Sequence, residues 1–232
     1  MPKKLLVSLV IVLGLSGFGF YLLKNRKNIH VVNGYENQPE IYRSAQLKIK
    51  DLEKLVKSKD IDMVLNLRGE SADEWYLQEK ALLEKLGIEY YSYGFSVYRT
   101  PDKERFLDIL DVLNKVKNEN KKLLIHCKAG ADRTGLISSI AQIVLYDYET
   151  EDAWEESLTW LYGHVPVEHG PLEQILDNYE NHENEMSFRD WVINEYSRKE
   201  ILIHAAEHNA IPKHRYTKAY FKKQKLPPKN AY

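Results

Sequence analysis

Residues 121–135, KKLLIHCKAGADRTG, have the pattern of a strand, a loop and a helix. Leu123 to His126 is a short apolar run of strand length, and Thr134 to Tyr146 has the apolar pattern of a buried helix. The loop between them carries glycine and Cys127, the only cysteine of the chain. Strand–loop–helix units of this kind build parallel sheets that have helices on both faces.

Strand and helix patterns alternate along the rest of the chain up to about residue 149. Beyond it, as far as residue 210, only helical patterns appear, so the sheet is complete before this part. The sequence therefore predicts an α/β fold, with a central, mostly parallel sheet flanked by helices and a helical C-terminal extension. A first strand is expected to begin within residues 29–41, further strands are predicted at 61–67, 88–93 and 123–126, and helices at 48–59, 71–86, 106–116, 134–146, 149–162, 170–182 and 187–209.

The net charge of −1 conceals an uneven distribution. Residues 1–30 hold five Lys or Arg and no acid, and residues 208–232 hold seven and no acid. The remaining 21 of the 33 bases stand against all 34 acids, a net of −13 for the middle of the chain. A nucleic-acid-binding domain needs its basic excess on the folded part, so no nucleic-acid partner is expected. A single Cys also excludes an intramolecular disulfide and a multi-Cys metal site.

Residues 5–23 (LLVSLVIVLGLSGFGFYLL) contain no charge and are flanked by bases on both sides. As a helix this segment would be about 28 Å long, enough to span a bilayer. A secretory signal usually has a shorter apolar region and a small-residue cleavage site, so we expect an uncleaved, single-pass anchor, with cleavage as the alternative. We expect the rest of the chain on the extracytoplasmic side. The flanking charges nearly balance, so the cytoplasmic side stays open.

The loop at residues 127–133 is suited to bind phosphate. A strand that leads into a helix through a glycine-containing loop directs backbone N–H groups and the positive end of the helix dipole to one point. The same field favours the thiolate of Cys127 over the thiol. Arg133 can bind two phosphate oxygens with its planar guanidinium, both in the ground state and in the transition state. These residues predict a Cys nucleophile that attacks phosphorus.

Residues 126–134 (HCKAGADRT) resemble the HC-x5-R-[ST] signature of the cysteine-dependent protein tyrosine and dual-specificity phosphatases. Residues 42–47 (YRSAQL) and 66–68 (NLR) are similar to the leading strands of bacterial dual-specificity-like members. The resemblance covers about residues 40–165. It implies a dual-specificity phosphatase-like fold and a phosphatase that forms a thiophosphate on Cys127 and hydrolyses it with water. No metal or other cofactor is implied.

The resemblance also assigns roles within the loop. Thr134 would hydrogen-bond the Cys127 sulfur and help to expel it, with an ordinary first-turn Thr as the alternative. His126 would brace the loop through backbone contacts. The residues expected to surround the phosphate are Lys128, Ala129, Gly130, Ala131, Asp132 and Arg133.

Two residues are candidates for the general acid. Asp102 is the only acid in residues 92–102, where the family places its acid on a mobile loop, but it also suits the first turn of the following helix. Asp132 lies inside the phosphate loop, as in the phosphoinositide phosphatases of the myotubularin and Sac groups. We favour Asp102, because an acid outside the loop can reach the leaving oxygen from the side opposite the nucleophile.

Other polar residues have weaker claims. Lys128 resembles the loop Lys of lipid and inositol phosphatases, which supplies charge for a second phosphate, and a solvated Lys is the alternative. Arg43 and Arg68 end strands that face the same pocket, and we expect both in structural ion pairs. Three further polar residues do not have the spacing of metal ligands, and we interpret them as part of a loop before the next helix. They are His164, Glu168 and His169.

The sequence thus predicts a membrane-anchored phosphomonoester hydrolase of the protein tyrosine or dual-specificity type. An inositol phosphate or phospholipid-headgroup phosphatase of the same superfamily is the alternative, and a catalytically weak phosphate-binding adaptor is an alternative of another class. An arsenate-type redox enzyme would need more cysteines. The expected partners are a phosphorylated protein, or a phosphorylated small molecule or lipid headgroup, and the membrane. The predicted parts are an anchor (1–24), a juxtamembrane linker and domain start (25–40), a catalytic domain (41–165), a helical extension packed on it (166–210) and a basic tail (211–232).

Overall fold

Three strands at the centre of the fold are buried on both faces. In the computed structural model, β2 (Ile41–Ser44), β3 (Met63–Asn66) and β5 (Leu123–His126) are buried along their whole length. A strand with helices on both sides needs no polar face, and this explains the continuous apolar runs in the sequence. The strand predicted at 123–126 is confirmed with the same bounds. The residues that the structure describes are 27–32, 38–167 and 170–208.

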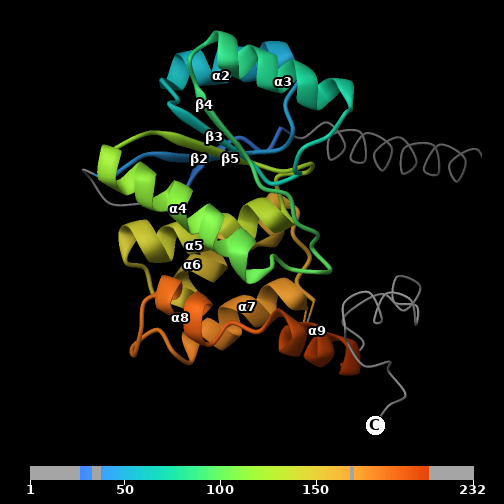
Figure 1. Ribbon diagram of the computed structural model, residues 1–232, viewed down its shortest axis with the longest axis vertical. Coiled ribbons are helices and arrows are strands. Elements are labelled where there is room, and N and C mark those ends of the chain that lie inside the picture. The colour runs from blue at the N-terminus through green and yellow to red at the C-terminus, as the bar shows by residue number, and fades with distance from the viewer. Residues whose placement is uncertain (1–26, 33–37, 168–169, 209–232) are drawn as a thin grey trace, which may run out of the picture.

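The sheet has five strands in the order β1-β2-β5-β3-β4 (Figure 1). β2, β5, β3 and β4 (Glu89–Ser92) are parallel, and β1 (His30–Val32) pairs antiparallel with β2 at one edge. The expected mostly parallel sheet is confirmed, and the antiparallel edge strand β1 makes it a mixed sheet. Where one first strand was expected within residues 29–41, the chain forms two, because turn-forming residues separate two apolar runs of the sequence.

The register of the sheet brings three loops to one edge. Ser44 of β2 and Asn66 of β3 both lie beside His126 of β5. The loops that follow these three parallel strands therefore leave the sheet together at its carboxyl edge, where open α/β sheets bind their ligands.

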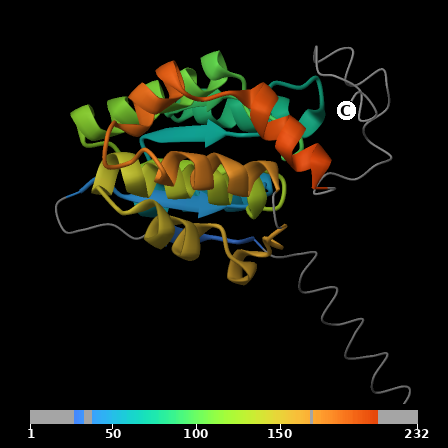
Figure 2. The same ribbon diagram turned by 90° about the horizontal axis from the view of Figure 1, so that it is seen from below.

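Helices cover both faces of the sheet (Figures 1 and 2). One layer consists of α2 (Ile49–Lys59) and α3 (Glu74–Lys85), and the other of α4 (Lys103–Glu119) and α5 (Asp132–Tyr146). Side chains alternate along each strand, so Val64 packs with the α2 and α3 layer, whereas its neighbour Leu65 packs with α4 and α5.

The C-terminal helices form a further layer against α4 and α5 (Figure 1). Their apolar side chains belong to the same buried cluster as those of α4 and α5. The aromatic rings of Phe106 in α4 and Phe188 in the extension lie 5.9 Å apart, edge to face. The elements of this part are α6 (Thr150–Ser157), the short 3-10 helix η1 (Trp160–Tyr162), α7 (Pro171–Glu180), α8 (Phe188–Asn194) and α9 (Arg198–Glu207).

The single helix predicted at 187–209 is two helices. Tyr196, between α8 and α9, turns into the core, and its hydroxyl donates to Pro101 O over 2.6 Å. Ser197 then begins α9 by accepting the Glu200 N–H on its side chain. Burial of one aromatic ring and a new helix cap thus interrupt a pattern that is helical on both sides.

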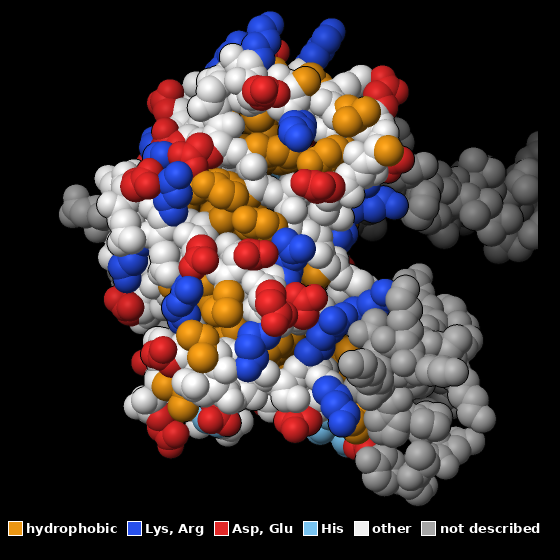
Figure 3. All heavy atoms as spheres, viewed as in Figure 1, with side chains coloured by type: hydrophobic (Ala, Val, Ile, Leu, Met, Phe, Trp, Pro, Cys, Tyr) orange, Lys and Arg blue, Asp and Glu red, His pale blue; other side chains and the backbone are white. Residues whose placement is uncertain are grey.

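Several predicted segments lie outside the described residues, among them the membrane helix at 5–23, residues 25–26 and 33–37 of the linker before β2, and the basic tail at 211–232. Of the helices in the described ranges, none combines the length and the apolar character that crossing a membrane requires. The face of the molecule in Figure 3 carries interspersed acidic and basic side chains.

Candidate active site

Cys127 is buried at the start of the loop between β5 and α5. Its side chain is held at the carboxyl edge of the sheet by β5, the central strand. The Gly130 N–H donates to Cys127 Sγ over 3.2 Å. An N–H group directed at the sulfur stabilises negative charge on it, which is the arrangement expected from a loop that leads into a helix.

The carbonyl groups of residues 128–131 accept hydrogen bonds from residues outside the loop. Because the C=O and N–H groups of a peptide unit point in opposite directions, this fixes the following N–H groups toward the interior of the loop. The donors are the Gln46 N–H to Lys128 O (3.3 Å), Asn28 Nδ2 to Ala129 O (3.0 Å) and Gly130 O (3.2 Å), and Arg43 Nη2 to Gly130 O (3.0 Å) and Ala131 O (3.4 Å).

Arg43 and Asn28 hold the Cys loop through its backbone carbonyls. Arg43 is 1% exposed, and its Nη1 also donates to Ser157 O over 2.6 Å. Asn28 Nδ2 donates to Tyr162 O over 2.7 Å, and the guanidinium of Arg43 lies 3.9 Å from the centre of the same Tyr162 ring. These contacts of Arg43 go to backbone carbonyls and to an aromatic ring, and the ion pair expected for it stays a prediction. No sequence pattern pointed to Asn28, which lies in the predicted linker.

Gly130 occupies a position that admits no side chain. Its φ is +68°, in the left-handed region, and a Cβ there would lie 2.6 Å from the backbone of Ser44 and Ala45. The loop can therefore pack against the end of β2 only with glycine at this position.

Arg133 ties the loops after β3 and β4 to the start of α5. Its Nη1 donates to Leu67 O over 2.8 Å and to Phe95 O over 3.2 Å. Within the described ranges its Nε and Nη2 have no hydrogen-bond partner. The guanidinium is thus fixed through one nitrogen and keeps two for a phosphate.

Thr134 and His126 do not make the contacts that the family resemblance implies. Thr134 is fully buried, and its Oγ1 has no hydrogen-bond partner among the described residues. His126 Nε2 contacts Glu79 Oε1 at 2.9 Å instead of the loop backbone. His126 therefore links the loop to α3, because the carboxylate of Glu79 reaches the end of β5.

Glu79 is a buried carboxylate at the centre of a hydrogen-bond network. It is 1% exposed and accepts from Tyr90 Oη over 2.7 Å and from Gln46 Nε2. Burial alone would raise the pKa of Glu79, but the attraction of His126 and these hydrogen bonds hold the pKa below its ordinary value. Arg68 continues the network, since its Nη1 donates to Gln46 Oε1 over 3.0 Å.

The two candidate acids lie in different surroundings. Asp102 is the N-cap of α4: it accepts the Arg105 N–H over 3.0 Å, and its other oxygen lies 3.9 Å from Arg198 Nη1. No contact joins Asp102 to the Cys loop in the described residues. Asp132 begins α5 beside Arg133, and its Oδ1 lies 2.8 Å from His164 Nδ1. The carboxyl group of Asp132 also lines a cavity of about 280 Å³.

His164 connects Asp132 to a second carboxylate, and the sequence analysis missed this connection. His164 is 3% exposed, and its Nε2 lies 3.0 Å from Glu173 Oε1 of α7. Burial alone would lower the pKa of His164, but the hydrogen bonds to Asp132 and Glu173 outweigh it and raise the pKa to about 9. Asp132 and His164 are 32 residues apart in the chain, so no local sequence pattern predicts their contact.

The stability contributed by His164 should depend on pH. Because its pKa in the folded protein lies above the ordinary value of 6.5, the contribution is complete below about pH 6.5 and is lost as the pH rises through about 9. We expect His164→Gln to lower the free energy of unfolding in urea strongly at pH 6 and much less at pH 9.5. The exposed His208→Gln is the control. A loss from His164→Gln that is the same at both pH values would contradict the charged pair.

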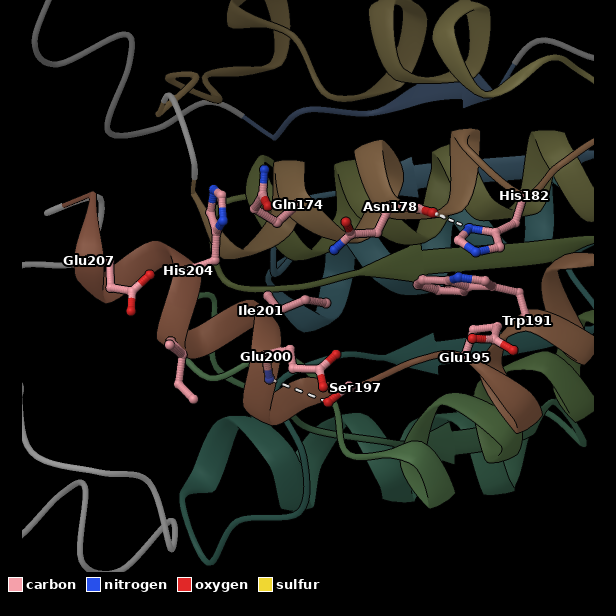
Figure 4. A pocket seen from close by; sticks show the side chains of 11 residues that line it. Gln174, Asn178, His182, Trp191, Glu195, Ser197, Glu200, Ile201, His204 and Glu207 are labelled. Carbon is pink, nitrogen blue, oxygen red and sulfur yellow. Dashed lines mark hydrogen bonds between the residues drawn. The ribbon is translucent and has the colours of Figure 1, made fainter. Parts of the chain in front are cut away.

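Lys128 and the cavity of the helical extension do not contribute to the interior of the Cys loop. Lys128 is exposed. A cavity of about 420 Å³ lies between α7, α8 and α9, with Trp191 and His204 among its lining residues (Figure 4). All of its lining belongs to the helical extension. Within the described ranges, no group of three or more His, Cys, Asp or Glu side chains is arranged to hold a metal ion.

Comparison with known proteins supports the resemblance read from the sequence. Residues 40–147 match a family model described as "Polymorphic toxin system, DSP-PTPase phosphatase". No curated protein sequence matches the chain.

Solved structures with a similar fold include three phosphatases. A glycine-to-alanine form of Tk-PTP is 22% identical, with a TM-score of 0.53 over 66% of this chain and 96% of that chain. PTPMT1 is 16% identical, with a TM-score of 0.52 over 67% and 96%. Kinase associated phosphatase is 18% identical, with a TM-score of 0.51 over 68% and 97%. The family match over residues 40–147, a part of the chain that includes the Cys loop of residues 127–133, identifies this part as a phosphatase domain of the DSP-PTPase type, and the solved structures show the same fold.

Proposed function

We propose that the protein is a phosphomonoester hydrolase in which Cys127 is the nucleophile and Arg133 binds the phosphoryl group. The observation that carries this proposal is the orientation of the loop, whose carbonyls at 128–131 are bound outside while the Gly130 N–H donates to Cys127 Sγ. Inward N–H groups and one guanidinium match the oxygens of a phosphate dianion. In kinase associated phosphatase the catalytic-site residue that was replaced by serine is a cysteine.

The reaction would have two steps. In the first, the Cys127 sulfur attacks phosphorus, the S–P bond forms, and the bond from phosphorus to the leaving oxygen breaks as an acid protonates that oxygen. In the second, a water oxygen attacks phosphorus, the S–P bond breaks, and the water proton returns to the carboxylate that acted as the acid. The products are an alcohol or phenol and inorganic phosphate, and the thiolate is restored.

A comparison of hydrolysis rates would identify the substrate class. We expect the full chain in detergent to release phosphate from para-nitrophenyl phosphate and from one or more of three classes: phosphopeptides, inositol phosphates and phosphoinositides. The full chain is needed because Asn28, which binds the loop, would be lost from a protein that begins at residue 30. Binding of phosphorylated ligands with no release of phosphate would favour the adaptor alternative.

We propose Asp132 as the general acid in place of Asp102. Asp132 lies beside Arg133, lines a cavity and is oriented by His164, whereas Asp102 is engaged as a helix cap. A general acid matters most for an alkyl phosphate, whose alkoxide leaves badly, and little for para-nitrophenolate. We expect Asp132→Asn to lose roughly 10²- to 10⁴-fold in kcat on alkyl phosphates and far less on para-nitrophenyl phosphate.

Asp102→Asn is the matched variant for this test. It should lose similar, small amounts of activity on all substrates, since it removes a helix cap. If Asp102→Asn rather than Asp132→Asn shows a loss that grows with the pKa of the leaving group, the acid is Asp102. Equal losses on all substrates for both variants would mean that neither is the acid.

A further inference from the structure

A cavity between the loops after β3 and β4 lies beside the proposed phosphate site. Its volume is about 670 Å³, and its lining comes from residues 68–70, residues 92–96 and Arg105 of α4. Arg133 donates to Leu67 O, just before the first of these segments, and to Phe95 O within the second. The cavity therefore adjoins the guanidinium that would hold the reacting phosphoryl group.

Arg68 lines this cavity. In the part of the chain that the structure describes, its guanidinium forms no ion pair, and Gln46 Oε1, at 3.0 Å, is the one hydrogen-bond acceptor of the guanidinium. The guanidinium lies 3.4 Å from the centre of the Trp75 ring. Stacking and one hydrogen bond thus fix the plane of the guanidinium and leave four of its five N–H donors for a ligand.

The electrostatic environment of Arg68 also favours an anion. Burial and the like charge of Arg133 lower the pKa of Arg68 below its ordinary value, and this outweighs the opposite effect of Glu79, Asp73 and the Cys127 sulfur. Two guanidinium groups that repel each other at a partly buried site are relieved when an anion binds beside them. The phosphoryl group at Arg133 is one such anion, and the open cavity beside Arg68 has room for another.

The position of Arg68 is set by the same network that holds the Cys loop. Gln46 accepts from Arg68 and donates to Glu79, and Glu79 contacts His126, which precedes Cys127. An arginine that is fixed before the ligand arrives loses less conformational entropy when it binds. The network therefore places Arg68 at a set position relative to the nucleophile.

We propose that this cavity is a subsite for a second anionic group of the substrate, a phosphate or a carboxylate, and that Arg68 binds it. The inference rests on the proposed phosphatase function and specifies its substrate. Arg105 adds positive charge to the wall, although Asp108 pairs with it at 3.2 Å, and its guanidinium lies over the Tyr93 ring. Glu70 is the acid among the lining residues, so the lining keeps a positive excess.

The test compares substrates with one and with two anionic groups. The full chain and Arg68→Gln are assayed on para-nitrophenyl phosphate, on inositol mono- and bisphosphates, and on phosphotyrosine peptides with either Glu or Gln as neighbours. We expect wild type to prefer the doubly anionic member of at least one pair. We expect Arg68→Gln to reduce that preference, measured as the ratio of kcat/KM values, by about 10- to 100-fold, the effect of losing a charge-assisted hydrogen bond. The pair that responds identifies the source of the second anion.

Two further variants keep the result interpretable. Arg68→Lys retains the charge but not the planar fork, so its preference should lie between wild type and Arg68→Gln. Arg189→Gln, which breaks an exposed ion pair with Asp111, should leave the ratio unchanged. The proposal is overturned if wild type hydrolyses para-nitrophenyl phosphate but prefers no doubly anionic substrate, or if Arg68→Gln lowers kcat/KM equally on all substrates. Failure of the phosphatase function itself would appear differently, as absence of hydrolysis on every substrate.

Discussion

Cys127→Ser is expected to abolish turnover, by more than about 10⁴-fold, while the protein still binds inorganic phosphate. The serine hydroxyl is not ionised near neutral pH, and no base of the described residues lies in contact with the Cys127 sulfur that it replaces, so the S–P intermediate has no equivalent. The groups that would hold phosphate do not depend on the sulfur. The loop carbonyls remain bound by Asn28 and Arg43, and Arg133 remains bound to Leu67 O and Phe95 O.

Two measurements separate loss of chemistry from loss of the site. Single-turnover assays should show no phosphoenzyme in Cys127→Ser, and phosphate should still raise the melting temperature by mass action. Gly130→Ala is a useful contrast, since its Cβ would meet the backbone of β2 and disturb the loop itself. That variant should lose both turnover and the phosphate-dependent rise. Turnover close to wild type in Cys127→Ser would exclude the Cys mechanism.

Local patterns predicted the centre of the fold well. β5 is apolar, short and followed by a glycine-containing loop, and its bounds agree with the prediction. Predictions failed where the fold depends on contacts between distant residues. The helix expected at 187–209 breaks because Tyr196 finds a buried hydrogen-bond acceptor at Pro101, 95 residues away in the chain. Helical periodicity carries no information about such a partner.

The same distinction applies to the site. Cys127 and Arg133 share one loop with a fixed spacing, so the sequence alone could propose them together. The residues that orient the loop come from elsewhere: Asn28 from the segment before β1, Glu79 from α3 and His164 from the loop before α7. Each of these has an ordinary polar sequence context. Their roles become visible only when the fold places them against loop carbonyls, against His126 and against Asp132.

Arg68 illustrates how one residue type can be misinterpreted at a strand end. An arginine after a buried strand was expected to pair with a carboxylate, which is the usual way to compensate a partly buried charge. The Arg68 guanidinium stacks on Trp75 and donates to one amide oxygen, and no carboxylate of the described residues forms an ion pair with it. An unpaired arginine at the carboxyl edge of a sheet favours a ligand over a structural role.

Arg133→Lys is expected to lower kcat/KM by roughly 10²- to 10³-fold, the typical effect of losing one oriented donor to the transition state. Arg133 performs two tasks at once: Nη1 binds the carbonyls of Leu67 and Phe95, and Nε and Nη2 remain for the phosphoryl oxygens. A lysine ammonium donates from a single point and cannot reach both carbonyls and two phosphate oxygens.

The variant should therefore also melt at a lower temperature, because the loops after β3 and β4 lose their shared anchor. Arg189→Lys, the same exchange at an exposed ion pair, is the control and should change neither quantity. If Arg133→Lys melts early but keeps kcat/KM within fivefold of wild type, Arg133 is an anchor and not a phosphate ligand. If both quantities fall, the two tasks belong to one guanidinium. Binding of the phosphoryl group would then be coupled, through Leu67 and Phe95, to the loops that line the cavity beside Arg68.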